Sequence, residues 1–147
     1  MPKTLIIGYG NPLRGDDGAG WRAARLLEER VRNPEVTVLA RHQLTPELAD
    51  NLRAADRAIF IDASAAQPPG TFVWREIQPR RAAPEWLSHD CDPPALLALA
   101  GALYGLCPQA YVVEIGGADF SYRDRLSPLV EERMAEVVDF VLARVEN

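Results

Sequence analysis

GYGNPLRGDDGAG, residues 8–20, places five glycines and two adjacent acids within thirteen positions. The apolar run Leu5-Ile6-Ile7 comes directly before this stretch, and an amphipathic segment follows it from Trp21. A continuous apolar run is typical of a strand that is buried on both faces of a parallel sheet. The order of the three segments predicts a strand, a tight loop and a helix, with the loop at the carboxyl edge of the sheet. In open α/β sheets this edge is where ligands bind.

The rest of the chain repeats this alternation of short apolar runs and amphipathic stretches. Pro68-Pro69-Gly70 favours a chain reversal, so the alternating segment after it is predicted to be an antiparallel edge strand. The predicted strands cover residues 3–8, 36–40, 57–61, 70–77 and 110–115, and the predicted helices cover residues 21–31, 45–54, 95–104 and 126–145. This order predicts a single α/β domain over residues 1–147, with a three-layer α/β/α arrangement around a mainly parallel sheet.

Composition and charge limit the classes of protein to which the chain can belong. The formal net charge is −5, which provides no basic surface for nucleic acid and no polybasic face for a membrane. The apolar runs are too short to span a bilayer, and none resembles a signal peptide. The two cysteines, Cys91 and Cys107, are too few for a disulfide framework. We therefore expect a cytoplasmic protein, and we expect it to be a monomer.

A glycine-rich loop after a first strand would also suit a nucleotide. The spacing disfavours a dinucleotide fold, because residues 11–13 read Asn-Pro-Leu where a third glycine is required. A P-loop is excluded because the stretch has no Gly-Lys-Ser or Gly-Lys-Thr ending. Asp16 and Asp17 would also repel a phosphate at the start of the following helix. Carboxylates at this position suit a cation or a proton transfer instead.

The two adjacent acids are expected to have different roles. Asp is a good helix N-cap, and one acid is enough for that purpose. We expect Asp16 to cap the helix or orient the loop, and Asp17 to point toward the site. The residues alone leave the reverse assignment open.

Three side chains that suit metal binding or acid–base chemistry are predicted to meet at the carboxyl edge of the sheet. Asp17 lies in the first loop, Asp62 follows the apolar run 58–61, and His89 lies in the long proline-rich loop 78–94. If the first and third strands are parallel neighbours, Asp17 and Asp62 emerge at the same edge, and the long loop can fold over them. Two carboxylates and an imidazole form an open site for a divalent ion, and the same set suits acid–base catalysis.

Other side chains near this edge have weaker claims to a role. Cys91 lies two residues after His89 and would serve as a thiolate nucleophile or a metal ligand, but a pair of this kind is a weak signal. His42 is expected in a loop beside the site. Cys107 precedes a proline between a helix and a strand, which is typical of a structural position.

The whole pattern resembles one family, the hydrogenase maturation endopeptidases that process nickel–iron hydrogenase large subunits. The resemblance rests first on residues 8–20, which are similar to the opening motif of that family almost throughout. It continues, in order along the chain, with Asp62 in the run FIDA, with Ser88-His89, and with LYGLCP at residues 103–108. Chain length and the order of the elements agree as well, so the resemblance covers nearly the whole sequence.

The resemblance implies a twisted, mostly parallel five-stranded sheet with helices on both faces. It also implies an activity, because members of the family remove a short C-terminal extension from the large-subunit precursor after nickel has been inserted. The positions that contact the metal in this family correspond to Asp17, Asp62 and His89. Nickel would then arrive with the precursor, which is the expected partner, rather than be held as a resident cofactor.

The residues leave the mechanism and one alternative function open. Asp17 or Asp62 would activate a water molecule as general base, or the two acids would share a proton as in an aspartic protease if they lie within hydrogen-bond reach. The alternative function is a non-catalytic maturation factor that binds nickel or the precursor on the same scaffold. A small nucleotide-using α/β enzyme is a third hypothesis, which the missing glycine and the tandem acids disfavour.

Overall fold

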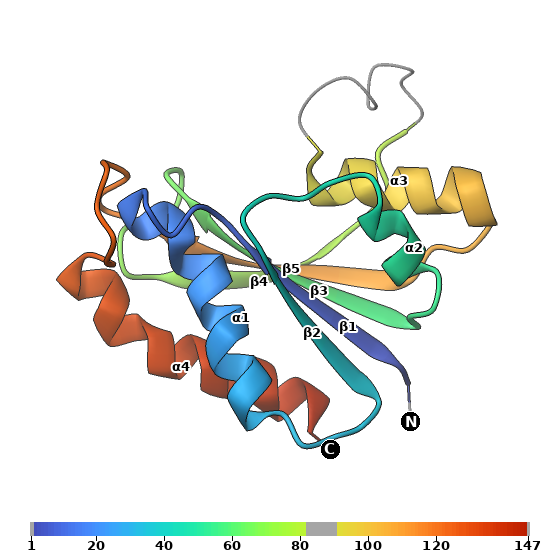
Figure 1. The fold of residues 1–147 in the computed structure, drawn as a ribbon, viewed down its shortest axis with the longest axis horizontal. Helices are drawn as coiled ribbons and strands as arrows, with labels where there is room; N and C mark the ends of the chain where they lie inside the picture. The colour runs from blue at the N-terminus through green and yellow to red at the C-terminus, as the bar shows by residue number, and fades with distance from the viewer. Residues whose placement is uncertain (1, 82–90, 147) are drawn as a thin grey trace.

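The computed structural model describes residues 2–81 and 91–146. It contains a five-stranded sheet with the strand order β2-β1-β3-β5-β4 (Figure 1). Four strands are parallel: β1 (Thr4–Tyr9), β2 (Val36–Arg41), β3 (Arg57–Ser64) and β5 (Gln109–Gly116). The remaining strand, β4 (Phe72–Ile77), is an antiparallel edge strand that pairs with β5. The predicted parallel sheet and its antiparallel edge are therefore confirmed.

Helices cover both faces of this sheet. One face carries α1 (Ala19–Arg30) and α4 (Pro128–Val145), which lie side by side, and the other carries α2 (Leu48–Leu52) and α3 (Pro93–Tyr104) (Figure 1). This confirms the three-layer arrangement. Among residues 2–81 and 91–146, no helix combines the length and the apolar character that crossing a membrane requires.

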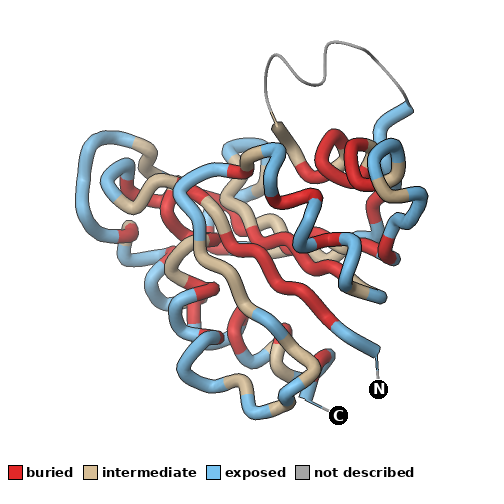
Figure 2. The backbone as a smooth tube through the Cα atoms, turned by 45° about the vertical axis from the view of Figure 1, so that its right-hand side comes forward, coloured by how far each residue is buried: buried red, intermediate tan, exposed pale blue. Residues whose placement is uncertain are grey.

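Alternate residues of the strands supply two separate hydrophobic cores. Ile6 and Ile59 pack toward the face that α1 and α4 cover, whereas Ile7 and Phe60 pack toward the face of α2 and α3. All four side chains are completely buried, and the buried backbone runs through the centre of the sheet in Figure 2. Burial of each such side chain stabilises the fold by about 1.5–3 kcal/mol, which makes the sheet a rigid base for the loops at its carboxyl edge.

Helix α1 starts in direct contact with the sheet because Gly20 has no side chain. A Cβ atom at this position would collide with the backbone carbonyl oxygens of Ile61 and Tyr9. Only glycine allows so close an approach of a helix to two strands. The short 3-10 helix η1 (Gly15–Gly18), which runs into α1, is thereby held beside the carboxyl ends of β1 and β3.

Three elements near the site have boundaries that differ from the predicted ones. The third strand continues to Ser64 instead of ending at Ile61, because residues 62–64 pair with residues 114–116 of β5. Asp62 therefore lies inside a strand. The helix predicted over residues 45–54 is limited to α2, because the Thr45 carbonyl accepts a hydrogen bond from the Leu48 N–H in a turn that precedes it. The first helix also starts earlier than predicted, at Ala19 instead of Trp21.

Candidate active site

Asp16 is fully buried and holds the first loop against the segment between β5 and α4. Its carboxylate accepts hydrogen bonds from the backbone N–H groups of Ala118 (2.7 Å), Asp119 (3.0 Å) and Ser127 (2.8 Å). The Ser127 hydroxyl donates a fourth bond of 2.8 Å. These donors occupy both carboxylate oxygens, which offsets the cost of removing the charge from water. Asp16 is therefore the acid that orients the loop.

Asp17 faces a cavity at the carboxyl edge of the sheet. Its Oδ2 accepts a 2.9 Å hydrogen bond from the backbone N–H of Asn11, on the other side of the same loop. Gly10 makes this return of the chain possible, because it adopts a φ of 142° and because a Cβ atom there would collide with the Asp17 carbonyl oxygen. The glycine-rich loop thus directs one acid inward and the next acid into the cavity.

Asp62 lies on β3 one residue beyond Ile61, the last residue of β3 that pairs with β1. The Tyr9 hydroxyl donates a 2.9 Å hydrogen bond to its Oδ2, and the Ala63 N–H donates a 2.8 Å bond to its Oδ1. Both oxygens of this carboxylate are therefore held in place. Because β1 and β3 are parallel neighbours, Asp62 and Asp17 do emerge at the same edge of the sheet, as predicted.

The environment of Asp62 shifts its acidity toward neutral pH. Burial raises the pKa of Asp62 from 3.8 to about 6, and the nearby charge of Asp17 acts in the same direction. The hydrogen bonds from Tyr9 and Ala63 oppose this shift because they stabilise the ionised carboxylate. The pKa of Tyr9 lies well above its usual value of 10, mainly through burial and then through the charge of Asp62, so Tyr9 remains a donor. Shifts of this kind are frequent at functional sites.

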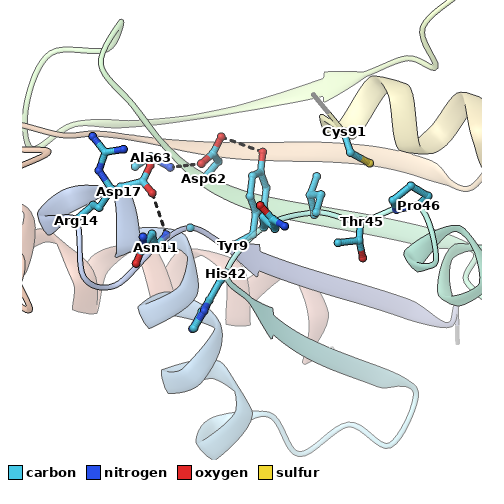
Figure 3. A pocket seen from close by; sticks show the side chains of 13 residues that line it. Tyr9, Asn11, Arg14, Asp17, His42, Thr45, Pro46, Asp62, Ala63 and Cys91 are labelled. Carbon is cyan, nitrogen blue, oxygen red and sulfur yellow. Dashed lines mark hydrogen bonds between the residues drawn. The ribbon is translucent and has the colours of Figure 1, made fainter. Parts of the chain in front are cut away.

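The cavity that Asp17 and Asp62 share has a volume of about 790 Å³. Figure 3 shows the two carboxylates on the same side of it, with Arg14 beside Asp17 and with Tyr9 between Asp62 and the turn at residues 43–46. The cavity is lined by Tyr9, Gly10, Asn11, Arg14, Asp17, His42, Gln43, Leu44, Thr45, Pro46, Asp62, Ala63 and Cys91. Within the described residues, no hydrogen bond joins Asp17 to Asp62, so the two acids do not share a proton as a dyad in this structure.

The third predicted metal-contacting residue, His89, lies outside the described residues, which end at Arg81 and resume at Cys91. In the part of the chain that is described, no three His, Cys, Asp or Glu side chains gather closely enough to hold a metal ion. Among the described residues that line the cavity, Asp17 and Asp62 are the two that carry a carboxylate.

His42 and Cys91 line the same cavity at other places. The His42 ring lies 5.9 Å from the ring of Trp21 on α1, and Figure 3 shows it directed away from the two acids. Burial raises the pKa of the Cys91 thiol, and the charges of Asp92 and Glu47 raise it further. This thiol is therefore protonated at neutral pH, which is the opposite of an activated nucleophile.

Two residues of the cavity were not singled out from the sequence. Tyr9 is the last residue of β1, and the parallel register that pairs Gly8 with Ile61 brings the next residue of each strand together. From the sequence, the pairing of the first and third strands was only a condition. Aligning these two strands in register would have been the signal that identified Tyr9. Arg14 stands before Gly15 in the first loop, and no pattern in the sequence distinguishes it from an ordinary exposed arginine.

Comparison with proteins of known sequence gives one informative relative and no matching family model. The chain is 31% identical over 149 residues to the hydrogenase expression/formation protein HupD of Thiocapsa roseopersicina. The alignment covers 96% of this chain and 66% of HupD, so the chain spans about two thirds of the length of that relative.

Solved structures show the same fold. The hydrogenase maturation protease HycI of Thermococcus kodakarensis superposes with a TM-score of 0.80 at 22% identity, over 99% of this chain and 94% of HycI. The hydrogenase maturating endopeptidase HybD of E. coli superposes with a TM-score of 0.75 at 26% identity, over 97% of this chain and 91% of HybD. Since HupD and HybD are both similar to it in sequence over nearly its whole length, the chain belongs to the hydrogenase maturation protease family.

Proposed function

We propose that the chain is an endopeptidase that removes a C-terminal extension from the precursor of a nickel–iron hydrogenase large subunit after nickel insertion. The observation that carries the proposal is the convergence of Asp17 and Asp62, from two different elements, on one cavity at the carboxyl edge of the sheet. Membership of the maturation protease family supports a processing role on such a precursor.

In this proposal nickel belongs to the substrate. Asp17, Asp62 and His89 contact the metal ion while thiolates of the precursor complete its coordination. Two carboxylates and an imidazole are ligands that a divalent ion of this kind accepts. Because the described residues provide only a partial ligand set, the site would recognise a nickel ion that another molecule already holds. An empty precursor would lack this contact and would be left uncut.

The proposed reaction is hydrolysis of one peptide bond. Asp17 or Asp62 accepts a proton from a water molecule while the water oxygen attacks the carbonyl carbon of the scissile bond. The C–N bond then breaks, and the proton passes to the leaving amine. The products are a new C-terminal carboxylate on the large subunit and a free extension peptide. A carboxylate with a pKa of about 6, such as Asp62, is both ionised and appreciably basic near neutral pH.

The test is to incubate the purified protein with a nickel-loaded large-subunit precursor from the same source and to measure the intact mass of the precursor. We expect loss of a C-terminal fragment that requires nickel. The variants Asp17→Asn, Asp62→Asn and His89→Ala should each lower the rate by at least about a hundredfold while remaining folded. Asp50→Asn is the matched control, because Asp50 is an exposed residue of α2 whose ion-pair partner among the described residues is Arg53, away from the cavity.

Two outcomes would contradict the proposal in different ways. A precursor that binds stably but keeps its full mass would favour the alternative, a maturation factor that binds nickel or the precursor without cutting it. Normal cleavage by all three variants would show that the chemistry lies elsewhere in the molecule.

A further inference from the structure

Arg14, which lines the cavity, has two exposed hydrophobic residues as neighbours, Leu13 before it in the chain and Tyr122 near its guanidinium. Leu13 is 59% exposed and Tyr122 is 85% exposed. The side chain of Arg14 lies between the cavity and Tyr122, since Arg14 lines the cavity and its guanidinium carbon is 5.8 Å from the centre of the Tyr122 ring. We call Leu13, Arg14 and Tyr122 the rim surface.

The backbone under the rim surface is firmly held. The Gly15 N–H donates a 2.9 Å hydrogen bond to the Arg123 carbonyl, and the Arg123 N–H donates a 3.0 Å bond to the Leu13 carbonyl. The buried carboxylate of Asp16, in the first loop, also accepts hydrogen bonds from the backbone N–H groups of Ala118 and Asp119, in the segment between β5 and α4. A backbone that is already fixed loses little conformational entropy when a partner covers it, which favours binding.

Arg14 differs from the nearby Arg123 in the interactions that its side chain makes. Arg123 pairs with Asp119 at 3.0 Å, whereas the Arg14 side chain forms neither a hydrogen bond nor an ion pair within residues 2–81 and 91–146. Its guanidinium is therefore available to a carboxylate from another molecule, for which its planar set of donors is well suited. Tyr and Arg, together with Trp, are enriched among the residues that contribute most of the binding energy at protein interfaces.

We propose that the rim surface is where the polypeptide substrate docks. This inference rests on the proposed function. Apolar side chains of the substrate cover Leu13 and Tyr122, and a carboxylate of the substrate binds Arg14. The rim surface and the cavity are continuous through Arg14, which Figure 3 shows beside Asp17. A polypeptide that enters the cavity at Asp17 therefore extends across Arg14 onto the two exposed hydrophobic side chains.

The test is to measure the cleavage rate of nickel-loaded precursor as a function of precursor concentration, for wild type and for variants of the rim surface. We expect Arg14→Glu to raise KM about tenfold or more, and Leu13→Ala and Tyr122→Ala to raise it about threefold to tenfold. For Leu13→Ala and Tyr122→Ala, kcat should change less than about threefold, because a docking contact is made equally in the ground state and in the transition state.

The chain offers closely matched controls. Leu103 on α3 is 60% exposed, nearly the same as Leu13, but lies on the other face of the sheet at the far end of α3 (Figure 1). Lys3→Glu makes the same change in net charge as Arg14→Glu, at the opposite edge of the sheet. Leu103→Ala and Lys3→Glu should leave KM within about twofold of wild type.

Each other outcome has a definite meaning. Rim variants that behave like the two controls would overturn the docking surface and leave the proposed function intact. A wild-type protein that leaves the nickel-loaded precursor uncut would instead overturn the proposed function, and the docking surface with it. If the wild type sediments as a dimer that Leu13→Ala converts to a monomer, the surface binds a second copy of the chain and the substrate proposal is wrong.

Discussion

The Tyr9 hydroxyl donates a 2.9 Å hydrogen bond to Asp62 Oδ2, and this bond joins two residues that are 53 positions apart in the sequence. Together with the Ala63 N–H, it holds both oxygens of the carboxylate. Donors to an ionised carboxylate lower its pKa, so this bond opposes the effect of burial, which raises the pKa of Asp62 to about 6. Tyr9 therefore positions Asp62 and keeps it ionised near neutral pH.

Tyr9→Phe removes the hydroxyl and leaves the ring. Because the lost donor stabilised the ionised form, we expect the pKa of Asp62 to rise further in this variant. On the acidic side of the pH–rate profile, the midpoint should move to higher pH by about half a unit to one unit. The reason is that a hydrogen bond to a charged group is worth roughly 1 kcal/mol or more. The measurement is the pH profile of precursor cleavage from pH 5 to 8. A profile that is lower at every pH but unshifted would indicate only a structural role for Tyr9.

Asp62→Asn should stabilise the protein in the absence of precursor. An acid whose pKa is raised from 3.8 to about 6 by folding binds a proton more readily in the folded state than in the unfolded state. Its ionisation therefore costs stability above pH 6, and the cost disappears as the pH falls through 6 toward 4. We expect the variant to be about 1–2 kcal/mol more stable than wild type at pH 8, because the amide avoids the buried charge but keeps only part of its hydrogen bonds.

Urea unfolding at pH 4.5 and at pH 8 measures this effect as the difference between variant and wild type. The difference should shrink at the lower pH, where Asp62 of the wild type is protonated in the folded state. An equal difference at both pH values would mean that the pKa of Asp62 is not raised in the folded protein.

The same substitution should destabilise the protein much more at Asp16 than at Asp17. Asp16→Asn places an NH₂ group among four hydrogen-bond donors in a fully buried site, which should cost about 2–4 kcal/mol of unfolding free energy. Asp17→Asn keeps an oxygen that accepts from the Asn11 N–H and should cost less than about 1 kcal/mol. Thermal unfolding of the two variants compares these effects directly. If Asp17→Asn were the more destabilising, the assignment of the two acids would have to be exchanged.

Substitution of Gly20 tests the contact between α1 and the sheet, and the same substitution at Gly101, in α3, is the control. Gly20→Ala drives a Cβ atom into the carbonyl oxygens of Ile61 and Tyr9, so the helix has to move and the protein should lose about 3 kcal/mol or more. Gly101 lies within α3, and a Cβ atom there would meet no atom of the described residues beyond its own helix within 4 Å. Gly101→Ala should therefore stabilise the protein by about 0.5–1 kcal/mol through helix propensity. Chemical denaturation checks both, and a tolerated Gly20→Ala would contradict the close approach.

Much of the fold follows from patterns that are local in the sequence. The apolar run before Gly8 predicts a buried strand because a parallel sheet covered on both faces removes every side chain of such a strand from water. The Pro68-Pro69-Gly70 turn predicts the antiparallel edge strand for a similarly local reason. The site was also partly predictable, since Asp17 follows β1 and Asp62 lies near the carboxyl end of β3, and parallel strands end at the same edge of a sheet. His89 stays a prediction, because it lies outside the described residues.

Contacts between distant residues decided the rest. The sequence by itself determined the strand–loop–helix unit, the order of the elements and the carboxyl edge at which the acids gather, because periodicity and turn residues act within a few positions. Only the tertiary structure decided that Asp16 is the acid that is buried, since its donors Ala118 and Ser127 lie 102 and 111 positions away. Only the structure showed that Tyr9 holds Asp62 and that the Arg14 side chain, near the Tyr122 ring, makes no hydrogen bond or ion pair among the described residues. The physical reason is that a hydrogen bond or an ion pair depends on which side chains packing brings within about 3 Å, and local patterns do not specify that.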